Sequence, residues 1–272
     1  QEGGRVARLR PPYWDVAGPP GTFAAMAATE GLAAACKAAY EGAATTARQL
    51  RAHGITVNCV PMADLRFSGS HAIIGDRAYG TEAQVAQVIR LARAVAAGTR
   101  DAGVWPVLKH LPGHGRAEQD SHHVLPVVTA PRAELAVDMA PFQALRDLPF
   151  GMTAHICYRA LDAKRPATFA PAVIRLIRED IGFRGTLMSD DLCMHALSGP
   201  MAARARAALD AGCDLALHCN GVLAEMQAIA RALSEDRRVW CYPPALRPDA
   251  GAQSAQAGSG YKATSRQRPE SP

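Results

Sequence analysis

The chain has 272 residues, of which 49% are hydrophobic, and a formal net charge of +5 at neutral pH. This length and composition allow a large buried core and exclude global disorder. The charge is modest and partly lies near the C-terminus (Lys262, Arg266, Arg268), which argues against a nucleic-acid partner. No apolar run approaches the roughly 20 residues needed to cross a bilayer, so we expect no membrane partner.

The seven cysteines are scattered, odd in number and without a CxxC pair. This usage indicates reduced, buried thiols rather than a disulfide framework, and we therefore expect a cytoplasmic protein. The chain starts QEGGRVARLRPP, with neither an initiator Met nor an apolar signal region. We expect this start to lie within a longer protein.

Apolar segments of strand length alternate with segments of helical spacing along the chain. An Ala-rich region at 22–52 predicts one or two helices, a buried strand is predicted at 55–65, and Thr81 is suited to N-cap a helix at 81–103. Further strands are predicted at 104–112, 151–158, 185–192, 214–220 and 238–244, and further helices at 131–145, 171–183, 201–213 and 222–235. This alternation predicts an α/β protein with a parallel sheet covered by helices.

Residues 1–242 are predicted to form this folded domain. From 243 to 272 the composition turns to Ala, Gly, Ser, Gln and Pro, which predicts a disordered tail.

Polar residues stand at the carboxyl ends of successive predicted strands. They are Asp64, Lys109 and His110, His155, Asp190 and Asp191, and Asn220. In a (β/α)8 TIM-type barrel such ends converge on one mouth, whereas a doubly wound open sheet concentrates its ligand near one switch point. Polar residues ending five strands in a row favour the barrel. Only five strands and a doubtful sixth are predicted, so we expect a barrel that is incomplete at its N-terminus.

The segment KHLPGHGRAEQDSHHVLP, at 109–126, holds four of the nine histidines. His110 and His114 have the i, i+4 spacing of a metal-binding helix, but Pro112 and Gly113 prevent a regular helix and the HExxH pattern is absent. We therefore predict no metal. Two interpretations of this segment remain open: a polar loop whose histidines only shape turns, and a catalytic loop.

A catalytic loop requires a nucleophile and a proton shuttle. Asp190 can offer a fixed carboxylate to an electrophilic carbon, and Asp191 points the other way if the strand continues. Asp120 stands two residues from His122, close enough in a turn to hold its tautomer and raise its basicity. Arg77, Lys109 and His110 are donors for hydroxyls or a carboxylate, and Asp64 is an acceptor for sugar hydroxyls. These residue types are those that a glycosidase needs, with a histidine in place of one of the two usual catalytic carboxylates.

The motifs QEGGRV, DRAYG, KHLPGHG, DSH and SDDL, in this order, resemble those of bacterial β-N-acetylglucosaminidases of glycoside hydrolase family 3. The resemblance runs from Gln1 to about Glu235. It implies that Asp190 is the nucleophile of a retaining mechanism and that His122, paired with Asp120, is the general acid/base. It also implies substrate-binding roles for Asp64, Arg77, Lys109 and His110, and for His155 and Asn220 at the ends of later strands. It implies no cofactor. Glu2 receives no role.

The implied function is an exo-acting, monomeric enzyme that removes N-acetylglucosamine from cell-wall muropeptides. A β-glucosidase, a glycoside phosphorylase and an inactive sugar-binding fragment remain as alternatives. The family carries about two further β/α units before QEGG, so missing strands would expose apolar edges.

Overall fold

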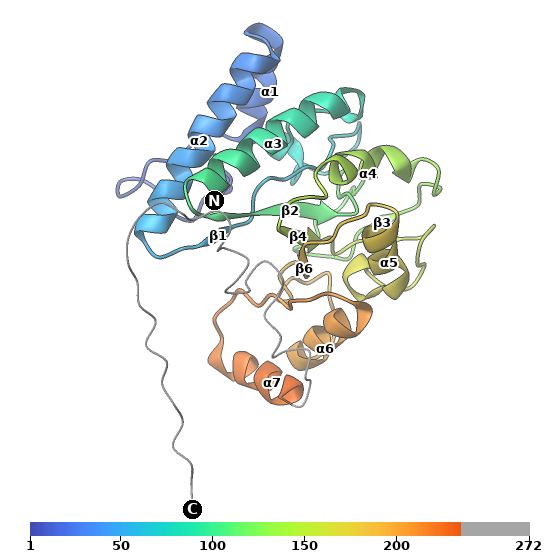
Figure 1. The fold of residues 1–272 in the computed structure, drawn as a ribbon. Helices are drawn as coiled ribbons and strands as arrows, with labels where there is room; N and C mark the ends of the chain where they lie inside the picture. The colour runs from blue at the N-terminus through green and yellow to red at the C-terminus, as the bar shows by residue number, and fades with distance from the viewer. Residues whose placement is uncertain (235–272) are drawn as a thin grey trace, which may run out of the picture.

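The computed structural model describes residues 1–234 (Figure 1). The predicted strand at 238–244 and the predicted tail at 243–272 lie outside the described residues. Within the described part of the chain, no helix is long and apolar enough to cross a membrane.

A parallel sheet of four strands forms the centre of the fold. In spatial order these are β1 (Val57–Asn58), β2 (Trp105–Leu111), β4 (Phe150–Thr153) and β6 (Thr186–Met188). The predicted strand at 214–220 is reduced to one parallel bridge between Leu215 and Met188. The α/β class with a parallel sheet is confirmed. The described residues form no closed eight-stranded barrel, because β1 pairs with β2 alone and does not meet β6.

The predicted strand at 151–158 divides between two sheets. Ala154 still donates its N–H to the Leu111 carbonyl, but Cys157 donates to Pro126 instead. Residues beyond β4 therefore leave the main sheet, and β5 (Cys157–Tyr158) pairs with β3 (Val127–Val128) in a two-stranded ribbon.

The two faces of the main sheet differ because strand side chains alternate. Val107, Phe150, Met152 and Met188 form a small apolar cluster on one face. Leu108 and Leu187 belong to the main core beneath the helices. Figure 1 shows the helices in an arc from α2 and α3 through α4 and α5 to α6 and α7.

The helices follow the predicted segments. Their bounds are α1 (Pro20–Thr29), α2 (Leu32–Ala52), α3 (Val85–Asp101), α4 (Leu135–Ala144), α5 (Pro171–Glu179), α6 (Met201–Ala211) and α7 (Leu223–Leu233), with 3-10 turns η1 (Gly75–Arg77), η2 (Glu82–Gln84) and η3 (Ala167–Phe169). The Ala-rich region divides into α1 and α2 at Gly31, whose φ of +91° ends one helix and admits the next. Thr81 forms a capping box with Gln84, whose Oε1 accepts the Thr81 N–H at 3.1 Å.

Candidate active site

A cleft of about 470 Å³ lies at the carboxyl ends of the strands, within the size range of small-molecule sites. The predicted site residues that line it are Arg77, Lys109, His110, His122 and Asp190. Residues from the N-terminal segment, among them Glu2 and Arg5, complete its wall. The cleft therefore brings together five of the nine predicted residues, from four separate segments.

Lys109 and His110 are sequence neighbours, yet both line the cleft. In a regular strand adjacent side chains point to opposite faces. Here the pairing of β2 with β4 shifts register between Lys109 and Leu111, so the alternation is broken at this point.

Asp64 lies behind His110 and is fully buried. Its Oδ2 is 2.7 Å from His110 Nδ1, and its Oδ1 accepts the backbone N–H of His114 at 2.6 Å. Burial alone would raise the pKa of Asp64, but the His110 ring and the His114 N–H outweigh it and lower the pKa. Asp64 was predicted to accept from sugar hydroxyls. In this structure it is absent from the cleft lining and orients His110.

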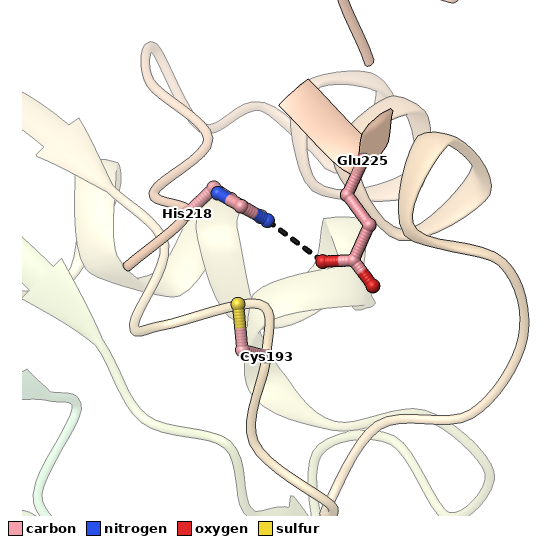
Figure 2. Close-up of side chains that lie close together, drawn as sticks. All are labelled: Cys193, His218 and Glu225. Carbon is pink, nitrogen blue, oxygen red and sulfur yellow. Dashed lines mark hydrogen bonds and ion pairs between the residues drawn. The ribbon is translucent and has the colours of Figure 1, made fainter. Parts of the chain in front are cut away.

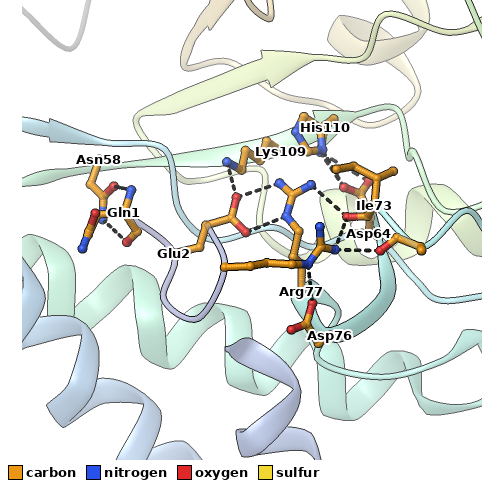
Figure 3. Close-up of polar contacts among 11 residues, drawn as sticks. Gln1, Glu2, Asn58, Asp64, Ile73, Asp76, Arg77, Lys109 and His110 are labelled. Atoms are coloured by element: carbon orange, nitrogen blue, oxygen red, sulfur yellow. Dashed lines mark hydrogen bonds and ion pairs between the residues drawn. The ribbon is translucent and has the colours of Figure 1, made fainter. Parts of the chain in front are cut away.

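Glu2 is the residue that sequence reasoning missed. Its carboxylate accepts two hydrogen bonds from the Arg77 guanidinium, at 2.7 and 2.8 Å, and lies 2.6 Å from Lys109 Nζ (Figure 3). The Glu2 side chain is 1% exposed. Burial would raise its pKa, but Lys109 and Arg77 hold the pKa far below its usual range. Glu2 thus fixes the two cations that were predicted to bind the sugar.

The glycines after Glu2 make this placement possible. Gly3 has a φ of +111°, and a Cβ there would collide with the carbonyl oxygen of Gly18. Only glycine fits such a turn. The motif QEGG was therefore the available signal, although it did not reveal the partners of Glu2.

Asp190 and Asp191 follow β6 and have different surroundings. Asp190 lines the cleft and accepts the Asp191 N–H at 2.8 Å. Burial would raise its pKa, but His110 and His155 outweigh this effect and lower it, so the group is a carboxylate at neutral pH. Asp191 Oδ1 instead accepts the N–H groups of Cys193 and Cys219, at 3.0 and 3.2 Å. The strand ends at Met188, so these different contacts, and not strand alternation, separate the two carboxylates.

Asp120 and His122 form a pair on a turn at the mouth of the cleft. Asp120 Oδ1 is 2.8 Å from His122 Nδ1 and also accepts the His122 N–H at 2.9 Å. A proton on Nδ1 leaves the Nε2 lone pair for proton transfer. The His122 side chain is 56% exposed, which leaves it accessible to a ligand.

The turn that carries His122 is held by its neighbours. Ala196 donates its N–H to the Ser121 carbonyl at 3.2 Å, and His195 donates to the His122 carbonyl at 3.3 Å. The Ser121 hydroxyl lies 3.2 Å from Nε2 of the buried His114. The turn is therefore connected to the loop that follows Asp190.

His155 and Asn220 do not line the cleft. His155 is fully buried, with Nδ1 2.7 Å from the Thr168 hydroxyl and Nε2 3.0 Å from the Asp191 carbonyl. Both ring nitrogens are therefore occupied. The Asn220 amide donates to Glu225 at 2.8 Å and accepts the Val222 N–H at 2.9 Å. Against the prediction of substrate contact, His155 supports the Asp190 loop and Asn220 holds the start of α7.

Side chains with metal-ligand chemistry gather elsewhere in the described residues, at Cys193, His218 and Glu225. None of the three lines the cleft. The pair His110 and His114, whose spacing raised the question of a metal, is instead bound to Asp64 and Ser121.

The chain is similar to known proteins over most of its length. A family model described as the glycosyl hydrolase family 3 N terminal domain matches residues 1–238. Over 225 residues the chain is 39% identical to a beta-hexosaminidase of Thiobacillus denitrificans and 42% identical to one of Methylococcus capsulatus. Each match covers 80% of this chain, and respectively 61% and 65% of the relative.

A solved structure shares the fold. The crystal structure of NagZ from Neisseria gonorrhoeae in complex with N-trifluoroacetyl-D-glucosamine matches with a TM-score of 0.75 and 34% identity, over 85% of this chain and 65% of that one. The chain thus spans less than two thirds of the length of these relatives. Because the family model matches residues 1–238 and the identities are near 40%, the chain belongs to glycosyl hydrolase family 3.

Proposed function

We propose that the protein is a retaining exo-β-N-acetylglucosaminidase that acts on cell-wall muropeptides. The observation that carries the proposal is a half-buried carboxylate, Asp190, in the same cleft as a histidine held by Asp120. The names of the relatives support the N-acetylhexosamine part of the substrate. We further infer a cytoplasmic monomer whose open sheet is part of a (β/α)8 barrel.

Asp190 would act as the nucleophile. Its oxygen attacks the anomeric carbon, the glycosidic bond breaks, and a covalent glycosyl-enzyme forms. His122, protonated on Nε2, gives this proton to the departing oxygen. Arg77 and Lys109, which are held by Glu2, would donate hydrogen bonds to sugar oxygens.

His122 would also serve the second step. Because the imidazole ring is neutral after the first step, its Nε2 can take a proton from water as the water oxygen attacks the anomeric carbon. The bond to Asp190 then breaks, and the product keeps the β configuration. Asp120 stabilises the protonated ring before and after each cycle.

The test is turnover of 4-nitrophenyl N-acetyl-β-glucosaminide by wild-type protein and by variants. Asp190→Ala is expected to abolish turnover, and His122→Ala to slow it by about 10²–10⁴-fold, the usual contribution of general acid–base catalysis. His123→Ala is the matched control, because His123 lies 3.9 Å from Asp120 in a much weaker contact. Unchanged rates in His122→Ala would refute the role of this residue.

The same assay separates an enzyme from an inactive fragment. No turnover together with a cooperative thermal melt and binding of N-acetylglucosamine would support a sugar-binding module instead. No turnover and no melt would mean that residues 1–272 do not fold alone.

Phosphorolysis is the second candidate. The cleft lining contains more cations than carboxylates, which favours an anionic acceptor. The cations are Arg5, Arg8, Arg10, Arg77 and Lys109, and the carboxylates are Glu2 and Asp190. A neutral histidine base would not repel phosphate. Formation of N-acetylglucosamine 1-phosphate in phosphate buffer, with slower turnover in its absence, would favour this activity over hydrolysis.

A further inference from the structure

Three side chains with metal-ligand chemistry converge beside the loop that follows β6. The donor atoms of Cys193, His218 and Glu225 all lie within 4.8 Å of one another. Figure 2 shows the thiol, the imidazole ring and the carboxylate turned toward a common space. They come from three segments: the loop after Asp190, the segment after the Leu215 bridge, and the first turn of α7.

The combination of sulfur, nitrogen and oxygen donors selects the type of ion. Thiolate and imidazole favour zinc and similar transition metals, whereas Mg²⁺ and Ca²⁺ prefer oxygen ligands alone. Zinc–ligand bonds of about 2.0–2.3 Å in a tetrahedron put donor atoms about 3.3–3.6 Å apart. The three donor atoms lie at most 4.8 Å apart, so small side-chain rotations would bring them to that spacing.

The ligands are already held in place by their neighbours. His218 Nε2 is 2.9 Å from Glu225 Oε2, and the Asn220 amide donates to the same oxygen at 2.8 Å. The Cys193 backbone is fixed through its N–H bond to Asp191. Such supporting contacts orient metal ligands and raise affinity.

The site is also reachable from solvent. The His218 side chain is 8% exposed, Glu225 is 37% exposed, and Cys193 is half-buried. An ion can therefore enter between His218 and Glu225, replace the hydrogen bond between them, and keep a water molecule as a fourth ligand.

We propose that Cys193, His218 and Glu225 form a binding site for a transition-metal dication, with Zn²⁺ as the best match. The ion would connect the loop after Asp190 to the first turn of α7 and so stabilise both. The site lies outside the cleft, and the proposal does not depend on the proposed function.

Cobalt provides the direct test, because a cysteine ligand gives Co²⁺ a thiolate-to-metal charge-transfer absorption that histidine and carboxylate ligands do not give. Anaerobic titration of the 1–272 chain with Co²⁺ is expected to show this absorption at one ion per chain, and Zn²⁺ is expected to displace the cobalt. Cys193→Ser should remove the absorption. His218→Gln and Glu225→Gln should each weaken binding by about ten-fold or more.

Matched variants exclude binding elsewhere. Cys36→Ser, on α2, and His195→Gln, an exposed residue of the same loop, should leave the cobalt spectrum unchanged. His122→Ala should also leave it unchanged, which separates this site from the Asp120–His122 pair. Wild-type protein without the charge-transfer absorption, or Cys193→Ser that retains it, would overturn the proposal.

Thermal melts give a second readout that does not need the cysteine variant to fold. Zn²⁺ at saturating concentration should raise the melting temperature of the wild-type chain and have little effect on Glu225→Gln. Circular dichroism of the metal-free Glu225→Gln protein checks that its fold is intact. An equal rise in both proteins would refute the role of Glu225 as a ligand.

Discussion

The cleft wall contains three charged side chains that are almost fully buried, those of Glu2, Arg77 and Lys109. Two cations share one carboxylate, so each charge depends on the others for its stability. Removing one partner of a buried ion pair leaves an uncompensated charge in a medium of low dielectric constant.

Glu2→Gln is therefore expected to lower the free energy of unfolding by about 3–5 kcal/mol. Arg132→Ala is the control, because the Arg132–Asp180 pair is exposed on both sides and such pairs contribute about 0–1 kcal/mol. Urea denaturation at neutral pH measures the free energy of unfolding of both variants and of the wild-type protein. Equal losses in the two variants would show that the Glu2 carboxylate does not compensate the buried cations.

His114 is a buried histidine that stays neutral. Burial, with His110 nearby, lowers its pKa from 6.5 to about 4. Between these values the unfolded chain binds a proton that the folded protein does not, so protonation favours unfolding. The stability contributed by neutral His114 is thus complete above about pH 6.5 and is lost as the pH falls toward 4.

We expect the neutral His114 to lower the free energy of unfolding of the wild-type protein by about 3 kcal/mol as the pH falls from 6.5 to 4, since one pKa unit corresponds to about 1.4 kcal/mol. Asp138 acts in the opposite direction, because burial raises its pKa to about 6. The difference between wild-type and His114→Gln therefore isolates the histidine. Urea denaturation across this pH range should give a flatter profile for His114→Gln, and parallel profiles would contradict the prediction.

At the scale of elements, α2 and α3 are packed closely at Gly98. A Cβ at this position would collide with the Tyr40 carbonyl oxygen and come within 3.2 Å of the Ala44 nitrogen, both backbone atoms of α2. The small-residue face of α2, with Ala35 and Ala39 fully buried, meets α3 here.

Gly98→Ala is expected to destabilise the protein by about 1–3 kcal/mol, although alanine is the better helix former. Gly42→Ala in α2 is the matched control, because its Cβ would meet only the Phe23 ring, at 3.5 Å. It should be neutral or stabilising by up to about 1 kcal/mol. Thermal melts compare the two, and a stabilised Gly98→Ala would show that the helices can separate at little cost.

The β4 segment also shows how an element places site residues. A continuous strand at 151–158 would have aimed its alternate side chains at the cleft. Instead the chain leaves the sheet after Ala154, and His155 turns to Thr168 and the Asp191 carbonyl. His155 therefore supports the loop that contains Asp190 through its contact with the Asp191 carbonyl.

Across the whole molecule, the cleft is built from segments that are far apart in the chain. Glu2 and Arg77 are separated by 75 residues, and His110 and Asp64 by 46. The turn bearing His122 contacts the loop after Asp190 through backbone bonds at Ser121 and Ala196. Substrate binding and proton transfer would thus depend on how these segments pack together.

Local chemistry was predictable from the sequence alone. The alternation of strands and helices follows from apolar periodicity, and the Asp120–His122 contact needs only a two-residue turn. These features depend on residues that are neighbours in the chain.

Only the tertiary structure decided the rest. Glu2 compensates Arg77 and Lys109, Asp64 orients His110, and Asn220 turns away from the cleft to Glu225. The set of Cys193, His218 and Glu225 has no sequence motif and exists only once three segments meet. Such contacts join residues with no fixed spacing, so packing determines which partner satisfies each buried charge.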